Sequence, residues 1–363
     1  MKVIFGVCAW GLGHATRSLP IIRKLIAENN DVTVICSGRA LAMLKAELVD
    51  SATYIDIPDY PAPKKSDKVG VLVEGLAYIP LYINCIRREM RAFEKVLARD
   101  NYGLIVADNR YGIYSKRIPS FIITHQLRIM NPFRLKVLER GTETYNRFFL
   151  KDGRRSGIIV PDWKDDSLSG DLSHNLHRID ESDIDYIGPI SDFAQRNVEK
   201  DIDVFFSVSG PEPHRSALEM KIRSQLDSVD GSILFSLGKS ESRETITNGN
   251  VTICDSLSSK DRELALNRAK LVVSRSGYST LMDIASVGTK ALFIPTPNQP
   301  EQEYLGAYHR QKGTYHCVSQ EELDLNSDIK KAHQFSGLNR KVDTKKAVEN
   351  AMRVFFSGKT LHW

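Results

Sequence analysis

The sequence lacks the features that would mark a membrane-spanning, secreted or repeat protein. No apolar run approaches the roughly eighteen residues that a membrane span needs. The strand-like start at Met1–Gly6 leaves no room for a signal peptide. Low-complexity tracts and internal repeats are also missing. These absences favour a globular protein of the cytoplasm.

Cysteine is scarce, and its pattern argues against disulfides and metal sites. The five cysteines are widely scattered, and most of them lie in apolar, strand-like segments. None takes part in a CxxC or Cys/His spacing of the metal-binding type. We therefore predict buried free thiols in a reducing compartment.

A strong charge of one sign is absent as well. The net charge of +5 over 363 residues suits an anionic substrate or membrane surface, but it is too small to indicate nucleic acid. The length suits two domains, each large enough to bury a core.

The clearest pattern in the chain is the stretch 271–307. An apolar strand at 271–273 leads into a turn of small residues, an amphipathic helix that ends before Gly288, and a second apolar strand at 291–294. Strand, helix and strand in this order predict a βαβ unit and therefore a parallel sheet.

The turn in this stretch has the chemistry of an anion site. Ser276, Gly277, Ser279 and Thr280 place backbone N–H groups and hydroxyls at a helix N-terminus, where the helix dipole favours negative charge. One turn further on, Asp283 offers a carboxylate that can hold a vicinal diol such as a ribose. The alternative is an ordinary helix cap with a tight turn.

Gln302 and Glu303 follow the second strand, in a loop bounded by prolines. This position is the carboxyl edge of the predicted sheet, where ligands bind in open α/β folds. Their amide and carboxylate groups suit sugar hydroxyls. We therefore expect three kinds of group at this edge: hydrogen-bond donors for a phosphate, a carboxylate for a diol, and amide and carboxylate groups for sugar hydroxyls.

A glycine-rich loop follows the first strand, 3–8. Gly11 and Gly13 precede a helix and form a phosphate-sized nest. A dinucleotide-binding fingerprint is one interpretation, but Thr16 stands where its third glycine would be. The next strand also ends without an acidic residue. Arg39 in that place would suit a 2′-phosphate, so a dehydrogenase remains an alternative.

The motifs RSGYSTLMD and P-x-P-N-Q-P-E-Q-E-Y-x-x-A, together with G-x-G-H in the first loop, resemble those of GT-B glycosyltransferases. The similarity is to relatives of the bacterial enzyme that adds N-acetylglucosamine to lipid I, and to archaeal predicted glycosyltransferases. It implies an α/β fold of two Rossmann-like domains facing across a cleft. The domains would be an acceptor domain at 1–187, a donor domain at 188–342 and a terminal helix at 343–363 that packs back on the first domain.

The resemblance also implies roles for the donor-side residues. Asp283 would hold the donor ribose, and Gln302 and Glu303 would bind the hydroxyls of the donor sugar. The donor diphosphate would be met by the turn at 276–280 and by further groups, and the uracil would be met by backbone groups. These additional candidates are Gly210, Arg215 and Arg275 for the diphosphate, and Ile253 and Cys254 for the uracil.

Two histidines compete for the role of general base. His14 sits at the start of a helix, which favours a neutral imidazole able to take the proton of an acceptor hydroxyl. The alternative is that it only caps or packs the turn. His125 follows the strand 120–124 and is the rival. Asp108 is a further acceptor-site candidate or a plain loop residue, and Arg17 is either a phosphate contact or a solvated helix charge.

The tract 128–155 mixes basic with apolar and aromatic side chains. It can be read as a nucleic-acid surface, as an anionic membrane surface or as an ordinary helix over a core. No nucleic-acid motif accompanies it. The resembled family often acts on polyprenyl-phosphate-linked acceptors, which favours peripheral attachment to the inner face of the cell membrane.

The predicted activity is transfer of a sugar, with N-acetylhexosamine as first candidate, from a UDP-sugar to an acceptor hydroxyl. Inversion at the anomeric carbon follows from the resemblance, with no cofactor besides the substrate and no required metal. The D-x-D pairs at 183–185 and 201–203 precede strands and so lie at the wrong edge for a ligand. The alternatives are a nucleotide-sugar hydrolase or epimerase, and a non-catalytic subunit.

Overall fold

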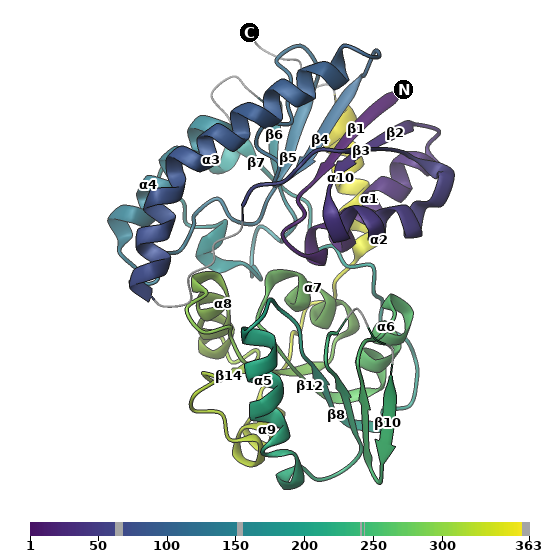
Figure 1. The fold of residues 1–363 in the computed structure, drawn as a ribbon, viewed down its shortest axis with the longest axis vertical. Helices are drawn as coiled ribbons and strands as arrows, with labels where there is room; N and C mark the ends of the chain where they lie inside the picture. The colour runs from purple at the N-terminus through teal and green to yellow at the C-terminus, as the bar shows by residue number, and fades with distance from the viewer. Residues whose placement is uncertain (62–67, 151–154, 240–241, 243, 358–363) are drawn as a thin grey trace. The chain divides into compact units, whose positions relative to one another are not determined.

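The computed structural model describes residues 1–61, 68–150, 155–239, 242 and 244–357. The chain divides into two compact units (Figure 1). Unit 1 comprises Met1–Asp192 and Asp343–Trp363, and unit 2 comprises Phe193–Val342. Unit 2 is therefore inserted between two segments of unit 1 along the chain.

Unit 1 contains a seven-stranded sheet in the order β3-β2-β1-β4-β5-β6-β7, and each neighbouring pair is parallel. Its central strands are largely apolar and buried, as expected for a parallel sheet covered on both faces. Its elements are β1 (Lys2–Val7), α1 (Leu12–Ala27), β2 (Asp31–Cys36), α2 (Gly38–Leu48), β3 (Thr53–Asp56), α3 (Lys68–Leu97), β4 (Leu104–Asp108), β5 (Ser120–Ile123), α4 (Lys136–Leu150), β6 (Gly157–Val160), β7 (Ile184–Tyr186) and α10 (Thr344–Phe356).

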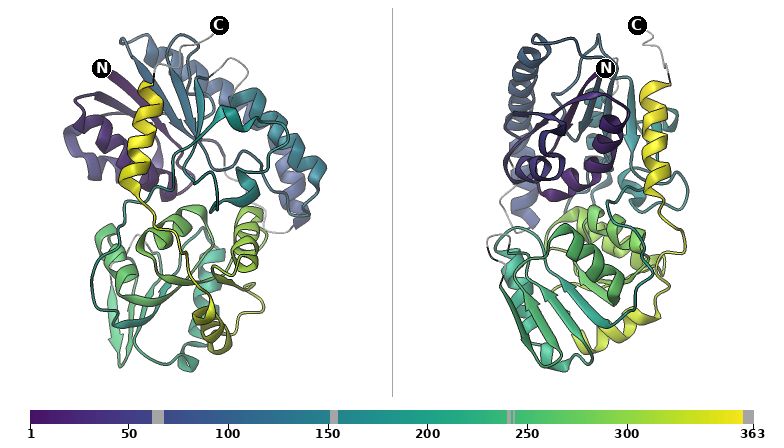
Figure 2. Two further views of the ribbon diagram at one scale, coloured as in Figure 1. Left: turned by 180° about the vertical axis from the view of Figure 1, so that it is seen from behind. Right: turned by 90° about the vertical axis from the view of Figure 1, so that its right-hand side faces the viewer.

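The last helix, α10, belongs to the core of unit 1. It lies beside α1 in both views of Figure 2, and its buried face shares one apolar cluster with that of α1. Phe355 packs on Phe121 of β5, with ring centroids 5.4 Å apart. Asp343 caps the helix by accepting a hydrogen bond from the backbone N–H of Lys346.

Unit 1 extends beyond the predicted domain boundary at 187 and ends at Asp192. Backbone contacts hold this extension in place. The N–H of Gly188 donates to Asp162 O, and Ser191 exchanges hydrogen bonds with the Thr344 hydroxyl. The segment 188–192 therefore belongs to unit 1.

Unit 2 contains a second seven-stranded sheet, in the order β10-β11-β9-β8-β12-β13-β14, and every pair is parallel except β10 with β11. The predicted α/β fold with two Rossmann-like sheets is thus confirmed. Its elements are β8 (Ile202–Ser207), α5 (His214–Arg223), β9 (Ile233–Ser236), β10 (Thr245–Asn248), β11 (Val251–Cys254), α6 (Ser259–Arg268), β12 (Ala269–Ser274), α7 (Tyr278–Val287), β13 (Lys290–Phe293), α8 (Pro300–Gln311), β14 (His316–Cys317) and α9 (Leu325–Gln334).

The central βαβ unit of unit 2 is β12-α7-β13, as predicted from the stretch 271–307. Helix α7 ends at Gly288, whose φ of 76° lies in the left-handed region that glycine adopts without strain. Strands β12 and β13 pair in parallel, so that Ser274 lies opposite Phe293 and both strands end at the same edge. The turn before α7 and the segment before α8 therefore meet at this edge.

Helix α3 is only partly buried. Its C-terminal half buries Ile86, Phe93 and Val96, but Ile79 is 46% exposed and the preceding turns also present apolar side chains to solvent. Within the described part of the chain, no single helix is long and apolar enough to cross a membrane. A bent pair, Val69–Gly75 with Ala77–Leu97, passes that test by length and composition only.

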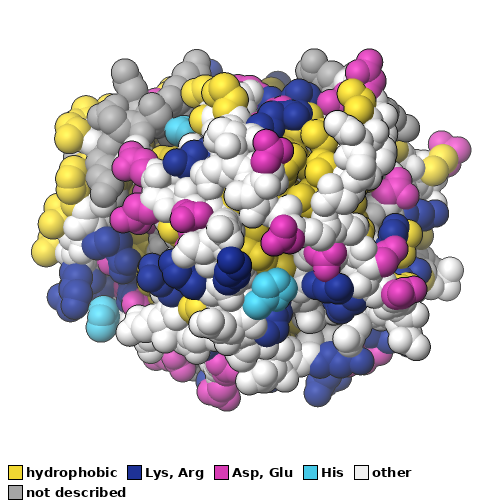
Figure 3. Space-filling model, turned by 90° about the horizontal axis from the view of Figure 1, so that it is seen from below, with side chains coloured by type: hydrophobic (Ala, Val, Ile, Leu, Met, Phe, Trp, Pro, Cys, Tyr) yellow, Lys and Arg dark blue, Asp and Glu magenta, His cyan; other side chains and the backbone are white. Residues whose placement is uncertain are grey.

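The surface carries charges of both signs. On the face shown in Figure 3, basic and acidic side chains are interspersed with uncharged ones. This mixture agrees with the small net charge of +5.

Candidate active site

In unit 1, His14 and Asp108 form a hydrogen-bonded pair at the carboxyl edge of the sheet. His14 lies in the first turn of α1, and its Nδ1 is 2.8 Å from Asp108 Oδ1. Asp108 ends β4, which pairs with β1, the strand that leads into α1. The carboxylate is fully buried, whereas the imidazole is 16% exposed. Asp108 is therefore more than the plain loop residue that the sequence allowed.

Arg17 is neither the solvated helix charge nor the phosphate contact that the sequence suggested. Its residue exposure is 3%, and its guanidinium is directed into the protein. Nε donates to Asp108 Oδ2 at 2.7 Å, Nη2 contacts Asp108 Oδ1, and Nη1 is 2.9 Å from His125 Nδ1. Arg17 thus joins Asp108 to both predicted histidines.

The Asp108 carboxylate is charged at neutral pH. Burial by itself would raise the pKa of Asp108, but Arg17 and His14 lower that pKa well below its usual value. The hydroxyl of Ser18 adds a hydrogen bond to Oδ2 at 2.9 Å. A charged carboxylate accepts hydrogen bonds only, so the His14 nitrogen that faces it carries a proton.

The protonation of the two imidazoles follows from their partners. Because Nδ1 of His14 donates to Asp108, the lone pair of a neutral ring lies on Nε2, which has no hydrogen-bond partner among the described residues. His125 is 5% exposed, and its Nδ1 faces a guanidinium that can only donate. Of the two candidates, His14 therefore has the geometry of a base.

The glycine loop before His14 is shaped by Gly11, which caps α1 with a φ of 124°. A side chain there would be strained, although no atom lies within 4 Å of the position its Cβ would take. Gly13 lies in the first turn of the helix. Trp10, 44% exposed, anchors the loop by donating from Nε1 to Tyr60 O at 2.7 Å.

In unit 2, the N-terminal turns of α7 and α8 lie together. The hydroxyl of Ser276 donates to the backbone oxygen of Gln302 at 2.8 Å, which ties the turn before α7 to α8. Gly277 is the N-cap of α7, and no side chain caps that helix. The backbone N–H groups of Ser279 and Thr280 have no intrahelical acceptor. The anion site that the sequence indicates at this turn stays a prediction.

Gln302 and Glu303 lie in the first turn of α8 and not in a loop, because the helix already begins at Pro300. Gln302 Oε1 accepts from Thr296 N at 2.9 Å, and Glu303 Oε1 accepts from Asn298 N at 2.9 Å. Both side chains thus brace the segment after β13. The Gln302 amide nitrogen and Glu303 Oε2 have no protein partner among the described residues.

Asp283 is 7% exposed and lies one turn into α7. Its Oδ2 is 3.3 Å from Nη2 of Arg262 on α6. Arg262 also stacks over Phe193, with its guanidinium carbon 5.5 Å from the ring centroid. Asp283 therefore carries a cationic neighbour from an adjacent helix.

The two arginines predicted to meet the diphosphate are used inside unit 2. Arg215 pairs with Glu212 and Glu219 and donates to Leu237 O at 2.9 Å. Arg275 is 2% exposed and donates to backbone oxygens of Ile294, Pro295 and His214. Burial lowers the pKa of Arg275 to about 10. Both guanidiniums fasten loops of unit 2, and their contact with a diphosphate stays a prediction.

Gly210 follows β8 and Cys254 ends β11, at the carboxyl ends of two strands of the unit 2 sheet. Gly210 has a φ of 118° and lies in the exposed loop between β8 and α5. Cys254 ends β11 and is 3% exposed. Its backbone oxygen accepts a hydrogen bond from Leu237 N at 2.9 Å. The contact of backbone groups at Ile253 and Cys254 with a uracil stays a prediction.

The basic tract 128–155 is less exposed than its sequence suggested. Arg128 is buried and pairs with Glu143 at 2.6 Å, and Arg155 is buried against backbone oxygens such as Ile113 O. Two basic residues of the tract, Lys151 and Arg154, lie outside the described residues. Exposed side chains remain in the segment before α4 and along the helix: Ile129, Phe133, Arg134, Leu135, Lys136, Val137, Arg140, Arg147 and Phe148.

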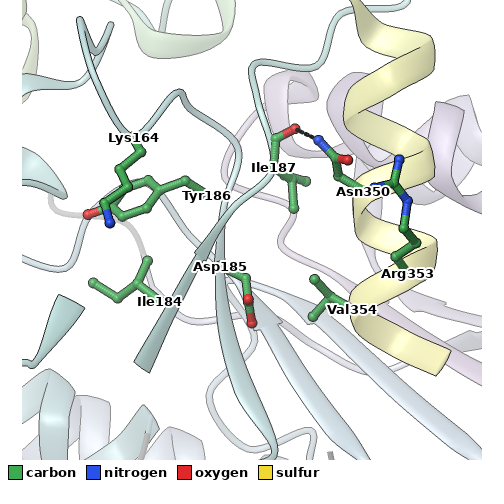
Figure 4. A pocket seen from close by; sticks show the side chains of 8 residues that line it. All are labelled: Lys164, Ile184, Asp185, Tyr186, Ile187, Asn350, Arg353 and Val354. Atoms are coloured by element: carbon green, nitrogen blue, oxygen red, sulfur yellow. Dashed lines mark hydrogen bonds between the residues drawn. The ribbon is translucent and has the colours of Figure 1, made fainter. Parts of the chain in front are cut away.

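In the part of the chain that the structure describes, the candidate site residues form no metal cluster, and they do not line the pocket of Figure 4. Among the described residues, no three His, Cys, Asp or Glu side chains are grouped so that they could hold a metal ion. A pocket of about 350 Å³ lies between α10 and β7 (Figure 4). It is lined by Lys164, Ile184, Asp185, Tyr186, Ile187, Asn350, Arg353 and Val354, with Asn350 donating to Ile187 O at 3.0 Å. None of the candidate site residues lines it.

Family models match both ends of the chain. Residues 219–354 match the glycosyltransferase family 28 C-terminal domain, and residues 1–56 match glycosyl transferase family 1. The first range includes Asp283, Gln302 and Glu303, and the second includes His14. The dehydrogenase alternative finds no counterpart in these matches.

The proteins to which this chain is similar include two curated relatives and one solved structure. A UDP-N-acetylglucosamine--N-acetylmuramyl-(pentapeptide) pyrophosphoryl-undecaprenol N-acetylglucosamine transferase of Histophilus somni is 37% identical over 84 residues, which cover 23% of this chain and 22% of that protein. An uncharacterized glycosyltransferase of Methanosarcina acetivorans is 23% identical over 316 residues, or 84% of this chain and 80% of that protein.

The solved structure is the calicheamicin glycosyltransferase CalG4, with a TM-score of 0.61 at 13% identity over 99% of this chain and 95% of that chain. The chain therefore has the GT-B fold, and its motifs resemble those of the lipid I N-acetylglucosaminyltransferases. The matched segment spans only 22% of the length of the Histophilus somni relative.

Proposed function

We propose that this chain is an inverting glycosyltransferase that moves a sugar from a UDP-sugar to an acceptor hydroxyl. The observation that carries the proposal is the His14–Asp108 pair, in which a buried charged carboxylate orients a partly exposed imidazole at 2.8 Å. The family matches at both ends of the chain support it independently. N-acetylhexosamine is the first candidate for the donor sugar, because the Histophilus somni relative is named for N-acetylglucosamine transfer.

In the proposed reaction, the acceptor O–H transfers its proton to His14 Nε2 while its oxygen forms a bond to the anomeric carbon. The bond from that carbon to the diphosphate oxygen breaks, and its electron pair leaves on the diphosphate. Attack opposite the leaving group inverts the anomeric configuration. Asp108 stabilises the imidazolium that forms.

The donor would be held by unit 2. The N–H groups of Ser279 and Thr280 at the start of α7 would stabilise the diphosphate charge, because preorganised donors there need no rearrangement. Asp283 would accept hydrogen bonds from the ribose diol. The Gln302 amide nitrogen and Glu303 Oε2 would bind the sugar hydroxyls, since their other atoms are already fixed by the protein.

The acceptor would be lipid-linked, at an anionic surface on the inner face of the cell membrane. Support comes from exposed apolar side chains next to basic ones at the start of α4, such as Val137, which is 80% exposed beside Lys136. A surface of this composition suits an interface between water and lipid. The name of the Histophilus somni relative, with its undecaprenol-linked acceptor, points the same way.

The test of the donor site is thermal unfolding of the whole chain with UDP, UDP-N-acetylglucosamine, UDP-glucose, GDP and NADP. A ligand at a hundred times its dissociation constant stabilises a protein by about 2.7 kcal/mol. We expect uridine ligands to raise the unfolding temperature of the unmodified protein and of Asp227→Ala, an exposed control in unit 2. The variant Asp283→Ala should lose most of this shift.

A shift with NADP and none with uridine ligands would refute the proposal. Release of free sugar from a UDP-sugar at the same rate with and without acceptors would indicate a hydrolase instead.

A further inference from the structure

We propose that Arg17 is a positioning residue that gives His14 and His125 opposite hydrogen-bonding roles, so that His14 accepts a proton and His125 donates a hydrogen bond. The catalytic consequence rests on the proposed glycosyl transfer. The assignment of the two rings does not, because it follows from the contacts that Arg17 and Asp108 make with them.

The role of His125 follows from the chemistry of a guanidinium. Arginine carries five N–H donors and no acceptor. Its Nη1 is 2.9 Å from His125 Nδ1, so this nitrogen must present a lone pair to it. A neutral imidazole with a lone pair on Nδ1 carries its proton on Nε2. A doubly protonated His125 would point an N–H at the cation, which disfavours that form.

The role of His14 follows from the other side of the same guanidinium. Arg17 contacts both oxygens of Asp108, through Nε at 2.7 Å and through Nη2, which fixes the plane of the carboxylate. In this orientation Oδ1 lies 2.8 Å from His14 Nδ1. Nη2 is also 3.0 Å from that nitrogen. The carboxylate decides the tautomer, because a lone pair on Nδ1 would face the lone pairs of a charged oxygen.

Lysine cannot do what Arg17 does here. The guanidinium is a planar fork that reaches Asp108 with two nitrogens and His125 with the third. An ammonium group is a single point and can serve one side only. The variant Arg17→Lys keeps a positive charge next to Asp108 but removes the planar fork. It therefore distinguishes the effect of the charge from the effect of the hydrogen-bond geometry.

The first experiment is long-range proton–nitrogen NMR of the full chain labelled with 15N at histidine, near neutral pH. The variants His14→Gln and His125→Gln assign the two rings. We expect the His14 proton on Nδ1 and the His125 proton on Nε2. A His125 ring protonated on Nδ1 or on both nitrogens, or a His14 proton on Nε2, would overturn the proposal. This readout requires no substrate.

The second experiment compares Arg17→Lys with Arg23→Lys. Arg23 lies on the same helix, is 42% exposed and pairs with Asp192, so it is a matched control for the helix. We expect Arg17→Lys to give mixed tautomers at His125. It should also lower kcat by about tenfold or more with little change in KM, because general base catalysis contributes ~10²–10⁴-fold. Arg23→Lys should change neither.

Unchanged tautomers in a folded Arg17→Lys protein would contradict the proposal, and a variant that fails to fold would leave the spectra of the unmodified protein to decide it. If the unmodified protein shows the expected tautomers but transfers no sugar to any acceptor, the proposed function fails and the assignment of the two rings stands.

Discussion

At Asp108 a single buried carboxylate receives hydrogen bonds from His14, Arg17 and Ser18, all within the first two turns of α1. A carboxylate is costly to bury unless it is paired, and here both of its oxygens accept hydrogen bonds. The hydrogen bond from His14, which helps to stabilise the buried carboxylate, also fixes the orientation of the imidazole. Stability and the proposed chemistry therefore depend on one side chain.

Replacing Asp108 with Asn should destabilise the fold and impair transfer together. Arg17 would be left as a buried cation without its partner, a situation that costs about 3–5 kcal/mol. His14 would lose the acceptor that selects its tautomer. Chemical denaturation and kcat measure the two effects. Asp192→Asn, which removes the exposed partner of Arg23, is the control and should cost about 1 kcal/mol or less.

The contribution of Asp108 to the stability of the fold depends on pH, and its direction can be predicted. Because folding lowers the pKa of Asp108, its stabilising contribution is complete above its unfolded pKa of about 3.9 and is lost as the pH falls below that value. The unmodified protein should therefore lose more stability than Asp108→Asn on acidification from neutral pH to pH ~3. Equal losses would mean that Asp108 is not the charged partner of Arg17.

Sequence reasoning reached His14 and Asp108 separately but could not pair them. They are 94 positions apart, and their contact depends on the pairing of β1 with β4. Arg17 was misjudged for the same reason, because nothing near it in the chain shows that its position faces inward. A charged residue ending a wholly apolar strand, as Asp108 does, was the one available signal.

At the scale of elements, the local signals of β12, α7 and β13 predicted the structure well. Gly288 ends α7, and the small residues at 276–277 mark its start, because these positions act through their own backbone. Strand β10 escaped notice because it is short and exposed along its whole length, so no burial pattern marks it. The sequence of the tract 128–155 overstated its exposed positive charge, because Arg128 is buried and pairs with Glu143, fifteen positions away.

The exposed start of α4 leads to a prediction about membranes. Val137→Asp places a charge on a side chain that is 80% exposed, so the fold should be unaffected. Binding to vesicles that contain anionic lipid should weaken by about tenfold, since that factor corresponds to ~1.4 kcal/mol and a buried valine contributes at least as much. Sedimentation with vesicles measures this.

The matched control for this prediction is Ile246→Asp, on the 65% exposed side chain of β10 in unit 2. It should leave vesicle binding unchanged. Equal weakening by both variants, or by neither, would speak against α4 as the contact.

At the scale of the whole molecule, each unit has its own core, and the proposed functions divide in the same way. Unit 1 packs α10 against α1 in one apolar cluster, whereas unit 2 has a separate cluster around β8 and β9. The base would lie in one unit and the donor-binding groups in the other. Damage to the core of unit 1 should therefore leave the binding of the donor nucleotide intact.

Ala351 offers the means to test this division. It lies on α10 and is fully buried against unit 1, so Ala351→Asp places an unpaired charge in that core. We expect a lower unfolding temperature for unit 1, while the uridine-dependent shift of the remaining transition persists. The control is Glu349→Gln on the exposed side of the same helix, which should change neither quantity. If Ala351→Asp abolishes the uridine response together with the fold, the donor site depends on unit 1, and the two units act as a single cooperative body.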